Sequence, residues 1–387
     1  MTGVMTPTRR EARLPIFPNL AMIQEAQEFL GRYFGRTRLV AAPFLSQKTG
    51  KKVFLKLETE LPTGSFKVRG ALWALAARMH RERVGVVHGA GVGGEPPKKG
   101  TMYRASTRDG IKVLGAGVGG EPPKKGTIYR AAARDGIKEV VASSTGNHGA
   151  AVAYAAKEFG IAAKIFLPAN CNPVKRGRIA ALGATIVESG GSDPASVFEL
   201  AAEYAKQPEV YFLNDGTDTD LPAGPGTITC EILEQLPETS AIVVPMGDTA
   251  LIRGIAAAAK QITPQVKIIG VQAERAPSYC LSWKEGKVVG TESCDTIADG
   301  LATRTPEEAN VRDVKSLVDD VVLVSEEEML RAIETLLVEE HVLAEPAGAA
   351  STAALLKSNA GCGDCPVLIV SGANISREVL KKAIQGA

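Results

Sequence analysis

The sequence predicts an α/β protein with two doubly wound, open-sheet domains. In the second half of the chain, short runs rich in valine and isoleucine alternate with amphipathic segments of ten or more residues, and the connections are short. Such runs are typical of parallel strands buried on both faces, because each strand needs a crossover helix before the next. A length of 387 residues, 45% of them hydrophobic, suits two cores better than one.

The predicted elements follow one another regularly. A helix is expected over 21–30, a strand over 53–58 and a helix that begins near Lys67. Further along, strands are expected at 139–142, 164–169, 184–189, 211–214, 241–246, 266–273, 320–324 and 366–370, and helices at 173–182, 198–206, 227–236, 251–262 and 326–337. Ser325 and Glu328 form a capping box, which predicts where the last of these helices begins.

Composition and charge limit the kinds of partner. The 45 basic and 43 acidic residues are interspersed and leave a net charge of +2, so there is no electrostatic case for nucleic acid or an anionic membrane. A small molecule is the expected partner. The N-terminal segment lacks the apolar core of a signal peptide, and no apolar run approaches the length of a membrane span. The expected location is therefore the cytoplasm.

The six cysteines are too few and too scattered for a disulfide scaffold. Cys362 and Cys365 form a CxxC motif, which could be half of a zinc site or a redox pair. Because no second CxxC and no nearby histidine completes a metal site, a turn before the strand at 366–370 is the favoured interpretation.

Four loops are candidate binding segments, because ligands of open α/β sheets collect beyond the carboxyl ends of strands. Lys67, in the first of them, would ordinarily be a surface lysine. Here Phe66 and the apolar helix face behind it are expected to bury it, and burial lowers the pKa of a lysine toward that of a nucleophilic amine. The loops are LPTGSFKVRGA at 61–71, SSTGNHGAA at 143–151, PMGDTALIRG at 245–254 and SGANIS at 371–376.

Six motifs occur in a fixed order: SFKVRGA, STGNHGAA, the loop before LIRGIA, ADGLA, EPAGAA and SGAN. The ordered set resembles the fold-type II pyridoxal-phosphate enzymes, of tryptophan synthase beta-like fold, in the branch of serine/threonine dehydratases (ammonia-lyases) and serine racemases. The similarity runs from about Leu39 to the C-terminus and is interrupted around residues 84–138. It implies pyridoxal 5'-phosphate as the cofactor and an amino acid as the substrate.

The resemblance also implies a role for each matching residue. Lys67 would form a Schiff base with the cofactor and would then remove the Cα proton of the substrate. Phe66 would pack against the pyridine ring, and Asn147 would hydrogen-bond the 3′-oxygen. Ser371 would face the pyridine nitrogen, where a hydroxyl cannot act as an acid and so favours β-elimination over transamination.

The substrate carboxylate and the cofactor phosphate are expected at two helix N-termini. Ser144, Thr145 and His148 would bind the carboxylate, and Thr145 matches the serine with which racemases protonate the opposite face. The residues expected to hold the phosphate are Gly247, Asp248, Thr249, Ala250 and Leu251.

Asp248 departs from the family pattern, which usually has consecutive glycines at this loop. Its charge is unfavourable beside a phosphate dianion unless the side chain turns away or caps a neighbouring N–H. No metal is predicted, because Gln272 stands where some relatives have a metal-binding carboxylate, although Glu274 leaves a weak site possible.

The first-choice reaction is dehydration of a β-hydroxy amino acid to a 2-oxo acid and ammonia. Val68 and Arg69 argue against the β-replacement branch of the family. L-Threonine and L-serine are the default substrates, and bulkier analogues such as phenylserine or hydroxyaspartate stay open. Two alternatives remain: a serine racemase, because Thr145 keeps a hydroxyl, and a catalytically silent scaffold, because of Asp248 and the inserted segment. A homodimer is expected.

A tandem repeat interrupts the resemblance. GAGVGGEPPKKGT occurs from position 89 and again from 115, and its glycines satisfy GxGxxG, but the prolines that follow exclude the helix that a dinucleotide site requires. It is expected to be an insertion over about 86–138 that protrudes as two loop-helix units. The predicted domains are a large cofactor-binding domain, 1–75 and 213–387, and a small mobile domain, 76–212.

Overall fold

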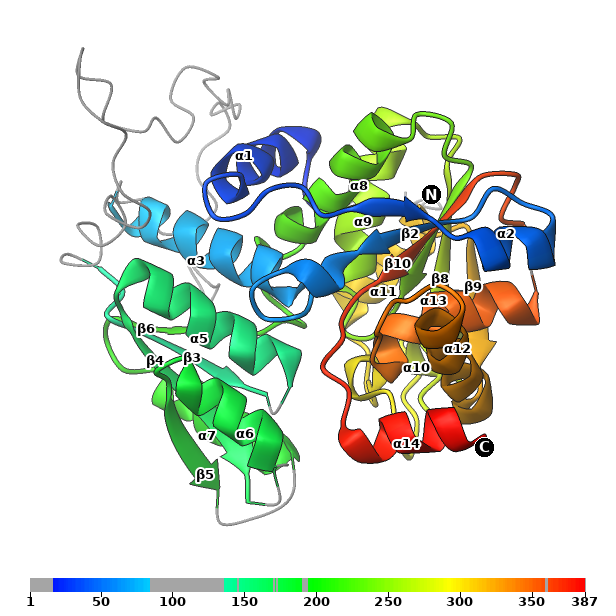
Figure 1. Cartoon of the computed structure of the whole chain (residues 1–387). Helices are drawn as coiled ribbons and strands as arrows, with labels where there is room; N and C mark the ends of the chain where they lie inside the picture. The colour runs from blue at the N-terminus through cyan, green and yellow to red at the C-terminus, as the bar shows by residue number, and fades with distance from the viewer. Residues whose placement is uncertain are drawn as a thin grey trace, which may run out of the picture.

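The computed structural model describes two parallel-sheet units, with helices packed on both (Figure 1). The predictions for the tandem repeat and for Thr145 lie outside the described residues. The domain boundaries 1–75 with 213–387, and 76–212, stay a prediction. The described residues are 17–83, 136–144, 146–169, 171, 173–189, 194–358 and 361–386.

The larger unit is built on a six-stranded sheet of order β1-β2-β10-β7-β8-β9. Its edge strand β1 is antiparallel to β2, and the other neighbouring pairs are parallel. β7 and β10 are buried along their whole length, as expected of central strands in a parallel sheet. The strands are β1 (Leu39–Ala41), β2 (Phe54–Leu57), β7 (Ala241–Pro245), β8 (Lys267–Ala273), β9 (Asp320–Val324) and β10 (Pro366–Val370).

Helices cover both faces of this sheet, which explains its apolar strands. Ile242 belongs to the same core cluster as Ile228 of α8 and Ile255 of α9, whereas its neighbour Val243 belongs to the cluster that contains Ile333 of α12 and Ala350 of α13. These helices are α8 (Ala223–Gln235), α9 (Ala250–Ile262), α12 (Glu326–Val338) and α13 (Pro346–Lys357). The unit also contains α1 (Leu20–Leu30), α2 (Pro43–Thr49), α10 (Ser278–Glu285), α11 (Glu308–Leu317), α14 (Arg377–Gln385) and the short helices η1 (Glu58–Glu60) and η2 (Asp299–Leu301).

The smaller unit is a four-stranded parallel sheet of order β5-β4-β3-β6. Val140 belongs to a core with Ala155 of α5, and the next residue, Val141, packs with Val197 and Ala201 of α7, so this sheet is also covered on both faces. Its elements are β3 (Glu139–Ser143), α5 (Asn147–Phe159), β4 (Ala162–Pro168), α6 (Pro173–Ala181), β5 (Thr185–Ser189), α7 (Pro194–Tyr204) and β6 (Val210–Phe212).

Helix α3 (Lys67–Arg83) joins the two units, because it packs against both α5 and α8. Its residues from Ala71 to Ala76 are almost fully buried, although the helix is not strongly amphipathic. A helix buried on most of its faces must be apolar around its circumference, as the sequence ALWALA is. Lys67, the first residue of α3, therefore lies at the end of a helix that belongs to the core.

Two local predictions are confirmed by the structure. Ser325 Oγ accepts from Glu328 N, and Glu328 Oε2 accepts from Ser325 N, which is the predicted capping box of α12. Cys362 and Cys365 are buried cysteines that form no disulfide and flank a turn, with the backbone of both residues hydrogen-bonded to Ser240 Oγ. In the part of the chain that the structure describes, no helix has the length and apolarity needed to cross a bilayer.

Candidate active site

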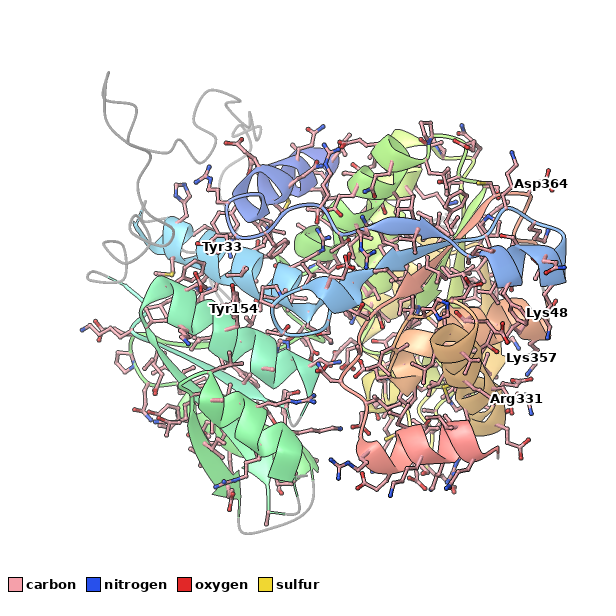
Figure 2. All side chains as sticks on the ribbon, viewed as in Figure 1. Tyr33, Lys48, Tyr154, Arg331, Lys357 and Asp364 are labelled. Carbon is pink, nitrogen blue, oxygen red and sulfur yellow. The ribbon has the colours of Figure 1, made fainter. Side chains whose placement is uncertain are left out.

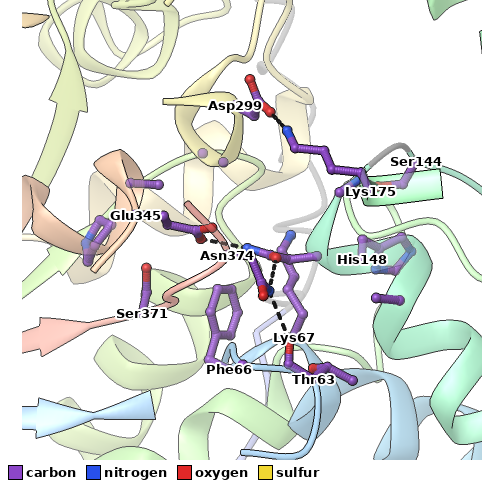
Figure 3. Close-up of a pocket in the computed structure, with 18 of the residues that line it drawn as sticks. Thr63, Phe66, Lys67, Ser144, His148, Lys175, Asp299, Glu345, Ser371 and Asn374 are labelled. Atoms are coloured by element: carbon purple, nitrogen blue, oxygen red, sulfur yellow. Dashed lines mark hydrogen bonds and ion pairs between the residues drawn. The ribbon is translucent and has the colours of Figure 1, made fainter. Parts of the chain in front are cut away.

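A cavity of about 710 Å³ lies between the two sheets and is lined by residues of both units. The four loops singled out in the sequence all contribute to it, because each follows the carboxyl end of a strand. Of the residues predicted for the site, those that line the cavity are Phe66, Lys67, Ser144, Asn147, His148, Gly247, Asp248, Thr249, Ala250, Leu251 and Ser371. Figure 3 shows most of the labelled side chains converging on one space.

Lys67 is positioned by contacts between the start of α3 and the end of β10. Ser65 forms a β-bridge with Gly372, and Phe66 N donates to Ser371 O at 3.0 Å. Gly64 makes the preceding turn with a φ of 69°, which a residue with a side chain would rarely adopt. As a result Lys67 Nζ, on a side chain only 13% exposed, lies 5.5 Å from the centre of the Phe66 ring.

Asp215 is the direct partner of Lys67. Lys67 Nζ donates to Asp215 Oδ2 at 2.6 Å. Burial alone would lower the pKa of Lys67, but Asp215, and then Asp248 and Glu345, raise it above its ordinary value. The predicted lowering of this pKa was therefore wrong for the chain by itself, because it considered burial without the carboxylates that other segments bring to the amine.

His148 is the second neighbour of Asp215. Its Nε2 lies 2.8 Å from Leu213 O, and because a carbonyl can only accept, Nε2 carries a proton. The other ring nitrogen, Nδ1, is 3.8 Å from Asp215 Oδ2. Burial would raise the pKa of Asp215, but His148 and Lys67 hold it well below its ordinary value. His148 is only 4% exposed, so it reaches the cavity as a buried ring.

Asn147 is held by a chain of amide and carboxyl groups. Asn374 Nδ2 donates to Asn147 Oδ1 at 2.6 Å and to Thr63 O at 2.9 Å, and Asn147 Nδ2 donates to Glu345 Oε1 at 2.6 Å. Burial raises the pKa of Glu345. Glu345 and Asn374 belong to sequence motifs that carried the resemblance, but no role was predicted for either of them.

The loop before α9 has the geometry of an anion cradle. Thr249 precedes the helix in the left-handed conformation, with a φ of 70°, and the unpaired N–H groups of the first turn lie at the cavity. A Cβ on Gly247 would lie 2.0 Å from Gly300 O, so a larger residue would displace the loop. Gly300 belongs to the ADGLA motif, so this motif lies directly against the loop that precedes α9.

Asp248 is the acidic residue of this loop, at a position where the family pattern usually has glycine. Its Oδ1 accepts from Thr303 Oγ1 at 3.0 Å, so the carboxyl has a partner outside the loop. Burial, and then the nearby charge of Asp215, raise the pKa of Asp248 above its ordinary value. The site therefore favours the neutral form of this acid more than water does.

Helix α6 faces the cavity with two basic residues that were not predicted. Lys175 forms an ion pair with Asp299 of η2, and Arg178 Nη1 donates to Asn374 Oδ1 at 2.9 Å. Both contacts cross from the smaller to the larger unit. Figure 3 shows the first of them, between Lys175 and Asp299. Sequence reasoning missed them because a lysine and an arginine three residues apart on a helix are usually a solvated face.

Gln272, which stands at the position of the metal-binding carboxylate of some relatives, is hydrogen-bonded within the protein. Gln272 is fully buried, and its Oε1 accepts from Cys280 N. Glu274 accepts from Lys357, which Figure 2 labels on the outside of the larger unit. Among the described residues, no group of three potential ligands could hold a metal ion.

The residues of the cavity fit pyridoxal 5'-phosphate. They provide a primary amine for an aldehyde, a helix N-terminus for a phosphate, an amide for a ring oxygen and, at Ser371, a buried neutral hydroxyl. Asp248 places a carboxyl within the segment that would hold the phosphate, and its raised pKa and its bond to Thr303 reduce that conflict. The fold and the cavity thus define an α/β enzyme that holds a small molecule between two sheets.

Comparison with known proteins gives the family. The profile described as "Pyridoxal-phosphate dependent enzyme" matches residues 31–94 and 123–372, and the chain therefore belongs to this family. The predicted membership and fold class are confirmed. The residues between the two matched ranges lie inside the tandem-repeat segment, where the resemblance was predicted to be interrupted.

Three similar proteins are named after two activities. An L-threonine ammonia-lyase of Thermotoga maritima is 33% identical over 362 residues, covering 94% of this chain and 77% of the relative. The crystal structure of a T.th. threonine deaminase has a TM-score of 0.73 at 27% identity, covering 93% of this chain and 99% of the other. Maize serine racemase has a TM-score of 0.74 at 27% identity, covering 95% and 97% of the two chains.

Proposed function

We propose that this chain is a pyridoxal-phosphate-dependent dehydratase, or ammonia-lyase, that converts L-threonine or L-serine to a 2-oxo acid and ammonia. The observation that carries the proposal is the Lys67 amine, which lies at the start of α3 and lines the cavity between the two sheets in a chain of this family. The predicted class, a lyase of the threonine dehydratase type, is confirmed by relatives named L-threonine ammonia-lyase.

The cofactor would be held by residues of three loops and one strand end. Lys67 would bind its aldehyde, Phe66 would contact its ring and Asn147 its ring oxygen. Ser371 would face the ring nitrogen, and the segment Gly247–Leu251 would hold the phosphate. When bound, the cofactor supplies an electron sink for negative charge that develops at the substrate Cα.

The protein's own part in the reaction is proton transfer and orientation. Lys67, as a free amine, would take the proton from Cα. The β-hydroxyl would take up one proton from solvent and leave as water, and Lys67 would return its proton to solvent at the end of the cycle. The unsaturated amine that results is released and hydrolyses to the 2-oxo acid and ammonia. Ser371 is buried and neutral, so it offers the ring nitrogen no acid, which suits elimination better than transamination.

The substrate carboxylate would bind at the N-terminus of α5. Ser144 lines the cavity and its Oγ accepts from Gly146 N at 3.3 Å, which places the hydroxyl at the first turn of the helix. Thr145 and His148 complete the proposed carboxylate site. A homodimer and a cytoplasmic location remain part of this proposal.

The decisive experiment is a product analysis. Purified chain reconstituted with pyridoxal 5'-phosphate is incubated with L-threonine and with L-serine, and 2-oxo acid, ammonia and D-isomer are measured. We expect equal amounts of 2-oxo acid and ammonia. D-Serine without 2-oxo acid would instead establish the racemase alternative, and bound cofactor without any turnover of hydroxy amino acids would establish a silent scaffold.

The acid in the phosphate loop gives a second prediction. Replacing Asp248 by asparagine is expected to tighten cofactor binding at neutral pH by about threefold to tenfold, because a charged carboxylate no longer faces the phosphate. The pKa of Asp248 is raised, so in the unchanged protein the carboxylate gains its charge as pH rises, and cofactor affinity should fall with it. Dissociation constants from absorbance titrations at several pH values test this.

Asp299→Asn is the matched control for this prediction. It removes a carboxylate from the same cavity, but one that is paired with Lys175 rather than located in the phosphate loop. Unchanged or weaker binding in Asp248→Asn, or an equal gain in Asp299→Asn, would show that the loop acid does not oppose the phosphate.

A further inference from the structure

We propose that Asp215 is a positioning residue that governs the proton on the Lys67 amine. The inference rests on the proposed function, because it assigns a partner to the reacting lysine. Asp215 was absent from the sequence-based site: it lies in the loop after β6, far along the chain from α3, and the fold brings its Oδ2 to 2.6 Å from Lys67 Nζ.

The loop that carries Asp215 is built to hold it. Asn214 Oδ1 accepts from Gly216 N at 3.0 Å, and Asn214 O accepts from Asp218 N at 2.9 Å, which closes a tight turn around Asp215. From the larger unit, the buried Asn310 of α11 donates its Nδ2 to Gly216 O at 2.8 Å. The carboxylate is thus fixed from both units rather than carried on a free loop.

The pair is also shielded from solvent. The side chains of Lys67 and Asp215 are only 13% and 19% exposed, so their attraction is screened less than that of a surface pair. The other ionisable groups that face Lys67 are Asp248 from the loop before α9 and Glu345 from the start of α13, and His148 of α5 faces Asp215. Asp215 is the one among them that accepts a hydrogen bond from the amine.

The chemical consequence follows from the lone pair of the amine. An ammonium has no lone pair, so Lys67 must lose a proton before it can attack an aldehyde or accept the proton of a substrate Cα. In the free chain, Asp215 keeps that proton on Nζ and slows the capture of an aldehyde. During turnover the same contact stabilises the ammonium that forms when Nζ takes the Cα proton, with the proton remaining on nitrogen.

The test measures the reactivity of Lys67 in the full-length chain freed of cofactor. Trace acetic anhydride acylates only unprotonated amines, and mass spectrometry of the Lys67 peptide gives the rate at each pH between about 7 and 10. In the unchanged chain we expect the rate to keep rising about tenfold per pH unit. In Asp215→Asn it should be about tenfold to a hundredfold faster at neutral pH and should level off at higher pH within the range.

Matched variants distinguish the effect of the Asp215–Lys67 ion pair from that of removing any acid from the cavity. Asp215→Ser is a second neutral variant, Asp215→Glu should keep the profile of the unchanged chain, and Asp299→Asn removes an acid of the same cavity that pairs with Lys175. Circular dichroism verifies that each labelled sample is folded. The proposal is wrong if the folded neutral variants keep the original profile, or if Asp299→Asn changes it equally. Because this readout needs neither cofactor nor turnover, its failure is distinguishable from failure of the threonine assay.

Discussion

Replacing Lys67 by alanine is expected to lower the rate of 2-oxo acid formation from L-threonine by about 10³-fold or more. The reason is that no other described amine takes its place: Lys175, which also lines the cavity, is paired with Asp299 on the opposite wall. The variant should also lose the absorbance band that the reconstituted protein shows when the cofactor is bound to an amine. Steady-state kinetics and a visible spectrum, taken on the same sample, check both expectations.

Lys67→Arg is the control for this experiment. It keeps a positive charge opposite Asp215, so the ion pair at the cavity is retained while the nucleophilic amine is lost. We expect it to unfold at the same denaturant concentration as the unchanged chain and to be as inactive as the alanine variant. If either variant retains a tenth of the activity, another group is the base.

The second large effect is expected at Arg69, two residues further along α3. Arg69 is 1% exposed and donates to both oxygens of Glu58, at 2.7 and 3.0 Å, and to both oxygens of Glu231, at 2.6 and 3.0 Å. Lys56, fully buried, adds a bond of 2.6 Å to Glu231. Two buried cations thus balance two buried carboxylates.

Arg69→Met should destabilise the chain by about 3–5 kcal/mol, because it leaves two buried carboxylates with one cation. Chemical denaturation followed by circular dichroism measures the change. Arg69→Lys keeps the charge but not the paired hydrogen bonds, so its stability should lie between that of the unchanged chain and that of Arg69→Met. Arg275→Met, which breaks an exposed ion pair with Asp295, is expected to change stability by no more than about 0.5 kcal/mol.

The pH dependence of stability has a definite sign at this cluster. Arg69 and Lys56 hold the pKa of Glu231 below its ordinary value, against the opposing effect of burial. A carboxyl whose pKa is lower in the folded state contributes stability that is present above its unfolded pKa and is lost as pH falls through its folded pKa. Acid should therefore destabilise the unchanged chain more than Arg69→Met, and equal losses in both would contradict this account.

Arg69 also shows where sequence reasoning reached its limit. In the sequence it is part of SFKVRGA and was used, with Val68, to choose among reactions. In the structure it does not line the cavity, because successive helical residues are turned by about 100° and residues 67 and 69 therefore point to nearly opposite sides. Its partners come from η1 and α8, which no local pattern connects with α3.

The error about Lys67 has the same origin. The apolar residues around it correctly predicted burial, and burial by itself lowers the pKa of an amine. Three carboxylates, on separate segments between residues 215 and 345, outweigh that effect at the cavity. A charge acts through space over a few ångströms, so its effect on a distant residue along the chain is invisible until the chain is folded.

The sequence by itself determined the α/β class and the order of strands and helices, because periodicity, caps and glycine turns are local properties. Its ordered motifs carried the resemblance that implied the family and the dehydratase type of reaction. Tertiary structure decided which side chains meet: Asp215 with Lys67, Glu345 with Asn147, and Lys175 with Asp299. The physical reason is that hydrogen bonds and ion pairs act over a few ångströms, and it is the packing of two sheets around one cavity that sets those distances.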